Sequence, residues 1–363
     1  MPQASRAPRS WFASTRRAPG ICRERSSVIS GAGQAQAPAA SEFELALAHP
    51  VVCVVGPTAS GKTDVAQEVA ARIGGAVISA DSMQIYRGMD IGTGKIAPDQ
   101  RRVEHFGLDI CEPGEPYSAA LFQDYARSCF RSLDAEGRRS VLAGGTGLYV
   151  RAAIDDYRFP RGEQTGNPVR DYYARVLEGQ GAQELWSMLE RRDPESAALI
   201  HPNNTRRVIR AFEMIELENT TYARQHEGFS HMAQSVPAVF FGLSVDPAVL
   251  NERIERRVDS MVERGLLDEV RSLAAHGFEG ALTAREAIGY KEIVAALRGE
   301  CTLDEGVEQI KTATRRYAKR QRTWWRKDER VRWIDADDAD VARMADEIVA
   351  SLDAARASAS SVR

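Results

Sequence analysis

The chain has 363 residues, of which 43% are hydrophobic, and a formal net charge of −3. This length suits one large domain or two of ordinary size, and the near-neutral charge excludes a protein that binds nucleic acid through its overall charge. No apolar run approaches the length of a membrane span, so we expect no membrane partner. The five cysteines are odd in number and match no zinc or disulfide spacing, which indicates a reducing compartment.

Residues 1 to about 46 differ in composition from the rest of the chain. Up to Ala40 they hold six arginines, no lysine and one acidic residue, Glu24, among many Ser, Ala, Pro and Gly. Low hydrophobicity without periodicity predicts a disordered extension. An organellar transit peptide and a start codon placed too early in a GC-rich gene fit the same composition. Composition does not decide among the three, and the predicted fold begins near Pro50.

The first predicted element is a β-strand with a glycine loop behind it. The strand, Val51 to Val55, is apolar and β-branched, and the helix after the loop, Asp64 to Ile73, has apolar residues at four-residue steps. The loop fits the pattern G-x-x-x-x-G-K-[ST] and consists of Gly56, Pro57, Thr58, Ala59, Ser60, Gly61, Lys62 and Thr63. In such a loop backbone N–H groups surround a phosphate, Lys62 adds a positive charge and the Thr63 hydroxyl suits Mg²⁺. The flanking strand and helix argue against a chance glycine turn, so the motif predicts polyphosphate binding.

A candidate catalytic carboxylate follows the next predicted strand, Ala76 to Ser79. Asp81 comes just past the carboxyl end of that strand, which is where α/β folds bind their ligands. The alternative is that Asp81 caps a following helix. The glycine-rich loop from Gly88 to Lys95 is a weak signal on its own. We then predict a strand from His105 to Ile110 and a helix from Tyr117 to about Asp134.

A third loop of the same kind follows the predicted strand Ser140 to Ala143. The loop, Gly144 to Tyr149, places the hydroxyl of Thr146 at a strand-to-helix turn, and the helix continues through Ile154. Alternating strands and helices predict an α/β fold, a P-loop NTPase-like parallel sheet flanked by helices. The P-loop, Asp81 and Thr146 should then meet at the carboxyl edge of the sheet.

The strand pattern stops between residues 160 and 233, which predicts a helical insertion between two halves of a catalytic core, 47–159 and 234–355. Its predicted helices are Val169–Glu178, Ala182–Arg191 and Thr205–Glu218. The second half opens with a strand, Val236 to Val245, and a long helix. That helix holds four arginines, namely Arg253, Arg256, Arg257 and Arg264. Near a polyphosphate, one or two of them should bind the anion rather than form a solvated face.

The segment Lys311 to Arg332 holds ten basic residues and two acidic ones. By helical spacing one face carries Arg315, Lys319, Arg322 and Arg326, with Tyr317, Trp324 and Trp325 interleaved. We favour a nucleic-acid contact over a solvated helix with core tryptophans, because the cluster is dense for a net acidic chain. A strand, Val331 to Ile334, and a helix, Ala339 to Leu352, close the prediction.

Seven stretches in a fixed order resemble one family, the bacterial-type tRNA dimethylallyltransferases (tRNA Δ2-isopentenylpyrophosphate transferases), over about residues 50 to 335. They are GPTASGKT, ADSMQIYRGMDIGTGK, HFGLDICEPGEPYS, GGTGLYV, HPNNTRRVIRAFE, REAIGYKE and TRRYAKRQRTWWR. A P-loop alone fits many families, whereas DSMQIYRGMDIGT together with GGTGLY is far more specific. The zinc finger that follows the core in eukaryotic members is missing here, which favours a bacterial-type, cytoplasmic and monomeric enzyme.

The resemblance implies transfer of a dimethylallyl group from dimethylallyl diphosphate to N6 of adenosine 37, beside the tRNA anticodon. It implies that the P-loop holds the diphosphate with Mg²⁺ near Thr63, that Asp81 accepts the N6 proton, and that Thr146 positions the substrate. Arg256, with Arg253, would neutralise the leaving diphosphate. The implied tRNA contacts are Asp81, Ser82, Met83, Gln84, Thr146, Arg170, Arg206, Arg207, Val208, Ile209, Arg210, Glu286, Ala287, Ile288, Gly289, Tyr290 and Lys291. The helical insertion would grip the anticodon loop.

Two alternatives come from other functional classes. One is a small-molecule enzyme, either an adenylate isopentenyltransferase or a nucleoside kinase that uses ATP. The basic residues of the insertion and of Lys311 to Arg332 argue against it, because a mononucleotide needs neither. The other is a non-catalytic RNA-binding protein, against which the intact set of Lys62, Thr63, Asp81 and Thr146 argues.

Overall fold

The computed structural model describes residues 45–157, 159, 167–230, 233–276, 278–281 and 283–360. Nearly all of the predicted N-terminal extension, residues 1–44, lies outside this range, as does the predicted boundary near residue 160.

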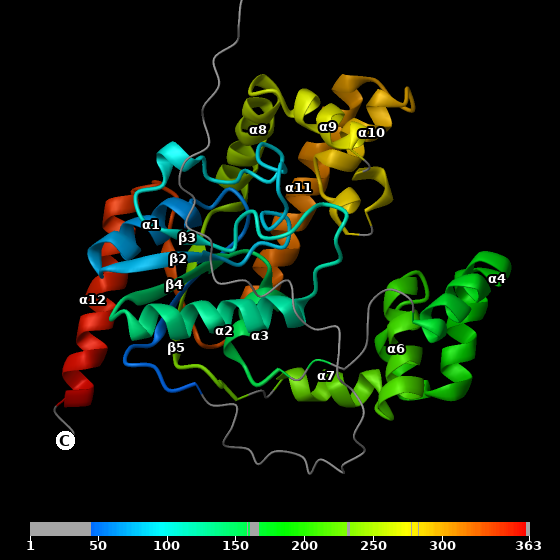
Figure 1. Cartoon of the computed structure of the whole chain (residues 1–363), viewed down its shortest axis with the longest axis horizontal. Helices are drawn as coiled ribbons and strands as arrows, with labels where there is room; N and C mark the ends of the chain where they lie inside the picture. The colour runs from blue at the N-terminus through cyan, green and yellow to red at the C-terminus, as the bar shows by residue number, and fades with distance from the viewer. Residues whose placement is uncertain are drawn as a thin grey trace, which may run out of the picture. The chain divides into compact units, whose positions relative to one another are not determined.

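Within the described residues, six parallel strands form one sheet in the order β3-β2-β4-β1-β5-β6 (Figure 1). The strands are β1 Val51–Val55, β2 Gly75–Ser79, β3 His105–Phe106, β4 Arg139–Gly144, β5 Ala238–Ser244 and β6 Val331–Asp335. The predicted α/β fold with a parallel sheet flanked by helices is confirmed. Because β1 pairs with both β4 and β5, the P-loop that follows β1 lies at the centre of the carboxyl edge.

The sheet is buried on both faces, which explains the continuous apolar run of β1. Val52 and Val54 face one core with helices α1 Lys62–Arg72 and α12 Val341–Ser360. Val51, Cys53 and Val55, which alternate with Val52 and Val54 along the strand, belong to the other core. That second core is covered by α2 Ala119–Ala135 and α3 Gly147–Ile154 (Figure 1).

Two predicted boundaries were wrong because the backbone turns there. Strand β3 ends at Phe106 rather than Ile110, since Gly107 and Asp109 have φ of +76° and +56°, which no strand accommodates. Helix α12 begins at Val341 rather than Ala339, whose φ of +56° is left-handed, and it continues past the predicted end to Ser360.

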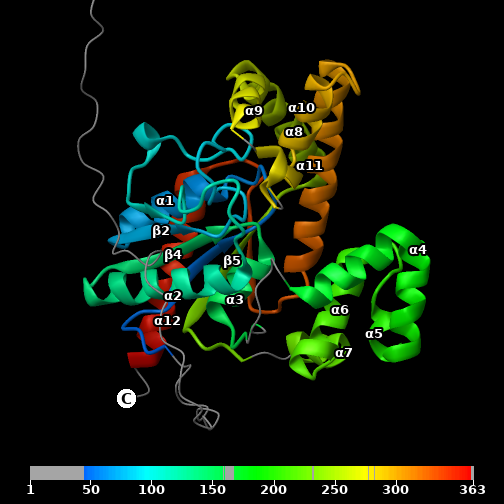
Figure 2. The same cartoon turned by 45° about the vertical axis from the view of Figure 1, so that its right-hand side comes forward.

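Four helices extend the first core beyond the sheet and border the candidate site. They are α8 Pro247–Glu263, α9 Leu266–Ala275, α10 Tyr290–Leu297 and α11 Leu303–Trp325. Short 3-10 turns are η2 Pro98–Gln100, η3 Phe278–Gly280 and η4 Ala284–Glu286. Figure 2 shows α11 as one long helix that runs beside α8 and α10.

The residues of the predicted insertion form four helices with an apolar core of their own. They are α4 Pro168–Arg192, α5 Pro194–Leu199, α6 Thr205–Glu218 and α7 Tyr222–Ser230. Gly181, with φ of +83°, breaks α4 into two parts that correspond to the first two predicted helices. Helix α6 has the predicted bounds, and α7 was not predicted.

Candidate active site

The P-loop leads directly from β1 into α1. Gly61 has φ of +84° and is the residue before the helix, so a side chain there would be strained. Ala59 also has positive φ, at +63°. The loop places the N-terminus of α1 at the carboxyl edge of the sheet, where the free N–H groups of the first helical turn can bind a phosphate.

Lys62 and Thr63 line a small pocket at the carboxyl edge of the sheet. The Lys62 ammonium donates a hydrogen bond to the Pro57 carbonyl at 3.0 Å. Burial lowers the pKa of Lys62 to about 8, the Asp81 carboxylate opposes this shift, and the Arg257 guanidinium adds to it. Asp81, Gln84 and Arg257 line the same pocket, so both cations face the place where a phosphate would bind.

A wider cleft of about 460 Å³ adjoins this small pocket. Thr58, Asp81, Thr93 and Arg257 line both cavities. Beyond them the cleft is bounded by apolar side chains of α8 and α11, among which are Val258, Met261 and Ile310. The pocket of the P-loop cations and the cleft therefore meet at shared residues, with Asp81 among them.

Arg257, and not Arg256, is the arginine of α8 that reaches the P-loop. Its guanidinium donates a hydrogen bond to the Thr93 carbonyl at 3.2 Å, and Gly94 leaves room for it. Within the part of the chain that the structure describes, Arg257 forms no ion pair with a carboxylate. Burial lowers its pKa, which the Asp81 carboxylate opposes. A guanidinium stays protonated in proteins, so an unpaired buried one favours an anionic ligand.

The expectation for Arg256 and Arg253 needs correction. Arg256 is exposed and lines neither the small pocket nor the cleft. Arg253 donates to the carbonyls of Ala336 and Asp337 at 2.9 and 2.6 Å, and so fastens α8 to the end of β6. Arg256 is turned about 100° around the helix from Arg257, whereas Arg253 lies one turn earlier on the Arg257 face and is held at the end of β6.

Asp81 has one oxygen engaged and one facing the cavities. Its Oδ1 accepts a hydrogen bond from the Met83 amide at 2.9 Å. The alternative role for Asp81 was a helix cap. Residues 82–85 form turns rather than a helix, so Asp81 caps a turn instead. Among the described residues, no hydrogen bond reaches Asp81 Oδ2. Asp81 can therefore hold its loop and accept a proton from a ligand at the same time.

Thr146 lies beside Asp81 and belongs to a small hydrogen-bonded network. Its Oγ1 accepts from the Ser82 amide at 3.3 Å, and Tyr317 of α11 lies next to it. Tyr317 and Gln321 were not recognised as site residues from the sequence, although their four-residue spacing places them on one helical face. Burial raises the pKa of Tyr317 to about 12, so its hydroxyl stays protonated at neutral pH.

Of the predicted tRNA contacts at residues 82–84 and 286–291, some line the cleft and others lie behind its lining. The cleft is lined by Ser82, Met83, Glu286, Ala287, Ile288 and Lys291. Gln84 lies deeper, where it accepts from the Ser79 hydroxyl at 2.9 Å and lines the small pocket. Tyr290 is fully buried and donates to Glu269 at 2.6 Å, and the Gly289 amide donates to Glu292 at 2.8 Å. These two positions do not line the cleft, and their predicted tRNA contacts stay predictions.

The predicted tRNA contacts of the insertion also fall into two groups, those with contacts inside the insertion and those exposed to solvent. Val208 and Ile209 are buried in the core of the insertion. Arg170 and Arg210 both bind the buried Glu213, Arg170 through two hydrogen bonds of 2.6 and 3.0 Å. These four positions have structural contacts within the insertion, and their predicted tRNA contacts stay predictions. Arg206 and Arg207 are exposed and remain candidates for a phosphate contact.

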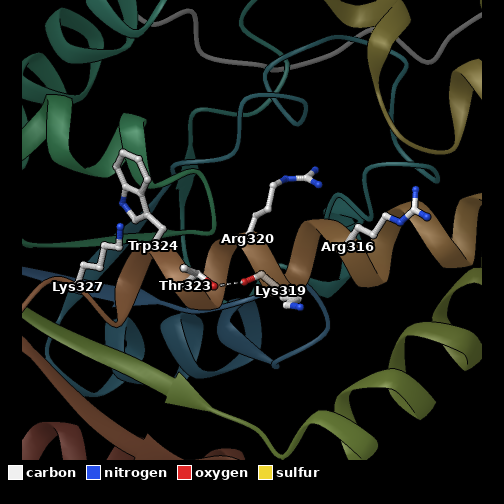
Figure 3. Close-up of a pocket in the computed structure, with 6 residues that line it drawn as sticks. All are labelled: Arg316, Lys319, Arg320, Thr323, Trp324 and Lys327. Carbon is white, nitrogen blue, oxygen red and sulfur yellow. Dashed lines mark hydrogen bonds between the residues drawn. The ribbon is translucent and has the colours of Figure 1, made fainter. Parts of the chain in front are cut away.

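The basic surface of α11 is rotated from the predicted one. Arg315 pairs with Glu255 of α8 at 2.9 Å, and Trp325 is fully buried. A hollow of about 450 Å³ is instead lined by Arg316, Lys319, Arg320, Thr323, Trp324 and Lys327. Figure 3 shows Arg316, Arg320 and Trp324 projecting to the same side of the helix. We call these six residues the outer face of α11.

The outer face is continuous with the mouth of the cleft. Arg316 and Arg320 line both the cleft and the hollow on the outer face. Lys291 joins Arg316 in a further groove between α10 and α11. A polyanion lying on this surface would therefore pass directly over the entrance to the cleft.

Comparison with known proteins assigns the chain. A family model described as IPP transferase matches residues 84–328, and one described as isopentenyl transferase matches residues 49–105. This chain belongs to the IPP transferase family. A tRNA dimethylallyltransferase of Carboxydothermus hydrogenoformans is 41% identical over 84% of this chain and 97% of its own. One of Geobacillus thermodenitrificans is 45% identical over 79% of this chain and 91% of its own.

Solved structures of IPP transferases have the same fold. The tRNA isopentenylpyrophosphate transferase of Bacillus halodurans is 40% identical, covers 84% of this chain and 97% of its own, and has a TM-score of 0.60. A eukaryotic dimethylallyltransferase acting on tRNA is 26% identical over 80% of this chain and 75% of its own, with a TM-score of 0.66. Membership of this transferase family sets aside the kinase and the non-catalytic RNA-binding alternatives. None of the helices that the structure describes has the length and apolarity needed to cross a membrane.

Proposed function

We propose that this protein transfers a dimethylallyl group from dimethylallyl diphosphate to N6 of adenosine 37 in tRNA and releases diphosphate. The observation that carries this proposal is a pair of adjoining cavities, one lined by the P-loop cations and one an open cleft, with Asp81 lining both. The relatives' names, tRNA dimethylallyltransferase and tRNA isopentenylpyrophosphate transferase, supply the substrate classes.

The leaving diphosphate fits the small pocket. Lys62 and Arg257 place two positive charges there without a carboxylate hydrogen-bonded to either. As the bond between C1 and the bridging oxygen breaks, negative charge grows on the diphosphate, and fixed cations stabilise it more strongly than they stabilise the intact donor.

Mg²⁺ fits the donor set of the same pocket. Thr63 offers a hydroxyl oxygen there. The described residues contain no group of three acidic, histidine or cysteine side chains that could hold a metal by themselves. Mg²⁺ commonly uses few protein ligands together with substrate phosphates, and here it would neutralise part of the diphosphate charge.

The adenine fits the cleft on the other side of Asp81. A base next to the anticodon must leave its stack to enter, and the outer face of α11 offers cations and the half-exposed Trp324 around the entrance. N6 attacks C1 of the donor, and Asp81 accepts the N6 proton as the new bond makes it acidic. Thr146 and Ser82 hold the loops that orient the base against Asp81.

The deciding experiment is incubation with dimethylallyl diphosphate, Mg²⁺ and a tRNA that contains A36-A37-A38, followed by nucleoside mass analysis. We expect adenosine to gain one dimethylallyl group at position 37. The same tRNA with A37 replaced by guanosine is the control. Absence of product with the folded wild-type protein would contradict the proposal, and release of ADP from added ATP during turnover would indicate a kinase.

A further inference from the structure

Helix α11 has an inner face that touches the catalytic loops. Gln321 is only 5% exposed, and its Oε1 accepts a hydrogen bond from the Thr58 amide of the P-loop at 2.8 Å. One turn earlier, Tyr317 lines the cleft and lies next to Gln321 and Thr146. A single helix therefore contacts the donor-binding loop and the base-side loop through two adjacent side chains.

These residues form a chain of neighbours across the site. The Thr58 amide donates to Gln321, and the Ser82 amide beside Asp81 donates to Thr146 Oγ1. Tyr317 lies next to both Gln321 and Thr146. All three strand-end loops that carry the proposed chemistry are linked by this chain. The Thr58 amide is consequently committed to Gln321 and not available to a phosphate, which fixes how this loop can turn.

Gln321 packs so closely against residue 145 that this position requires glycine. A Cβ atom on Gly145 would lie 2.1 Å from Gln321 Nε2 and 3.2 Å from the Gly56 carbonyl oxygen. Gly145 therefore leaves the space through which Gln321 reaches the P-loop. This observation is independent of the hydrogen bonds, and it points to the same contact.

We propose that Gln321 and Tyr317 are positioning residues for prenyl transfer. Gln321 holds the P-loop in the form that binds the diphosphate, and Tyr317 holds Thr146 and the adjoining Asp81 loop in the form that presents the base. The inference rests on the proposed function and adds two residues that act through others. It predicts that loss of Gln321 changes the KM for the donor, whereas loss of the Tyr317 hydroxyl changes kcat.

The test uses Gln321→Met, which keeps the size of the side chain without the hydrogen bonds, and Tyr317→Phe, which removes only the hydroxyl. Gln321→Met should weaken binding of inorganic diphosphate with Mg²⁺, and raise KM for the donor, by about 3- to 10-fold, the usual effect of one buried hydrogen bond. Tyr317→Phe should lower kcat by about 10-fold and leave donor KM within twofold. Gln100→Met, at an exposed glutamine of η2, is the matched control and should change neither.

A second perturbation acts on the same contact from its other side. Gly145→Ala should displace Gln321 from Thr58 and reproduce the donor effect. The double variant Gly145→Ala with Gln321→Met should then be no worse than the more impaired single variant, since both remove one interaction. Fully additive effects would contradict a shared contact.

The outcomes separate this inference from the proposed function. If wild-type protein forms no prenylated nucleoside, the proposed function fails. If the wild type is active and the folded Gln321→Met and Tyr317→Phe variants match it within twofold in kcat and donor KM, the positioning role is overturned. A change in the KM for tRNA alone would also overturn it, because the inner face would then serve only the docking of tRNA.

Discussion

Arg256 and Arg257 are consecutive residues of α8, yet only Arg257 reaches the cavity in front of the P-loop. Successive residues of an α-helix differ by about 100° in direction. Here that angle puts one guanidinium against the Thr93 carbonyl and the other in solvent. The pair therefore offers a matched comparison of the same side chain in and out of the candidate site.

Arg257→Ala should lower kcat/KM for the prenyl donor by about 10²-fold. The reason is loss of a fixed positive charge that faces the diphosphate as negative charge develops on it. Arg256→Ala should leave this constant within about twofold. Single-turnover prenylation at limiting donor is the measurement, with melting temperatures to confirm that both variants fold. Equal losses in the two variants, or a loss only in Arg256→Ala, would remove Arg257 from the assigned role.

The sequence could not distinguish these two arginines. The glycine loop and the alternation of strands and helices predicted the sheet and the P-loop, because these depend on local spacing. The direction of Arg257 depends on which side of α8 packs against the loop that contains Gly94, and that is set by tertiary contacts. The same holds for Gln321, whose partner Thr58 lies 263 positions away along the chain.

Helix α11 is a second case in which the sequence did not show which side of a helix faces the protein. Its density of basic residues was visible, but the predicted face included Arg315, which pairs with Glu255. The spacing of basic residues shows which of them share a face of the helix, but it does not show which face is exposed to solvent. Helix α11 buries Ala318, Gln321 and Trp325, and this orientation leaves Arg316 and Arg320 exposed.

Charge reversal on the outer face of α11 should weaken tRNA binding. The variant Arg316→Glu, Lys319→Glu and Arg320→Glu removes three cations that can contact phosphates, so the slope of log affinity against log salt should fall by about 2 to 3. Filter binding of tRNA at several salt concentrations measures both effects. The control reverses three exposed arginines on other elements, namely Arg131, Arg271 and Arg332. An unchanged slope in the α11 variant would mean that its outer face is ordinary solvated surface.

The low pKa of Lys62 predicts a pH dependence of donor binding. Burial lowers this pKa to about 8, so Lys62 is charged below pH 8 and becomes neutral as pH rises through that value. Donor binding should therefore weaken above about pH 8, by up to tenfold per pH unit, because the diphosphate needs the protonated form. The donor KM measured from pH 6.5 to 9.5 checks this.

Lys62→Arg supplies the control for that pH profile. A guanidinium stays protonated throughout the range, so the rise in donor KM above pH 8 should disappear even if the variant is less active overall. Tyr317, with a pKa raised to about 12, does not titrate there and is no rival explanation. Persistence of the same rise in Lys62→Arg would assign it to another group.

The last prediction concerns Asp81, whose carboxylate has a structural and a proposed catalytic task. Asp81→Asn retains Oδ1 as acceptor for the Met83 amide, so the turn should persist and the protein should fold normally. An amide cannot accept the N6 proton, and kcat should fall by about 10²–10⁴-fold, the usual range for loss of a general base. Single-turnover prenylation with saturating tRNA and donor measures this step without interference from binding.

Asp81→Ala complements the asparagine variant, because it removes the turn cap as well as the base. It should lose about 1 kcal/mol of stability in addition, the typical effect of removing a capping side chain. If Asp81→Asn is folded and keeps kcat within threefold while only Asp81→Ala is impaired, the carboxylate acts through the turn alone. The proton acceptor would then have to be sought on the diphosphate itself, which would lie in the adjoining pocket beside Lys62 and Arg257.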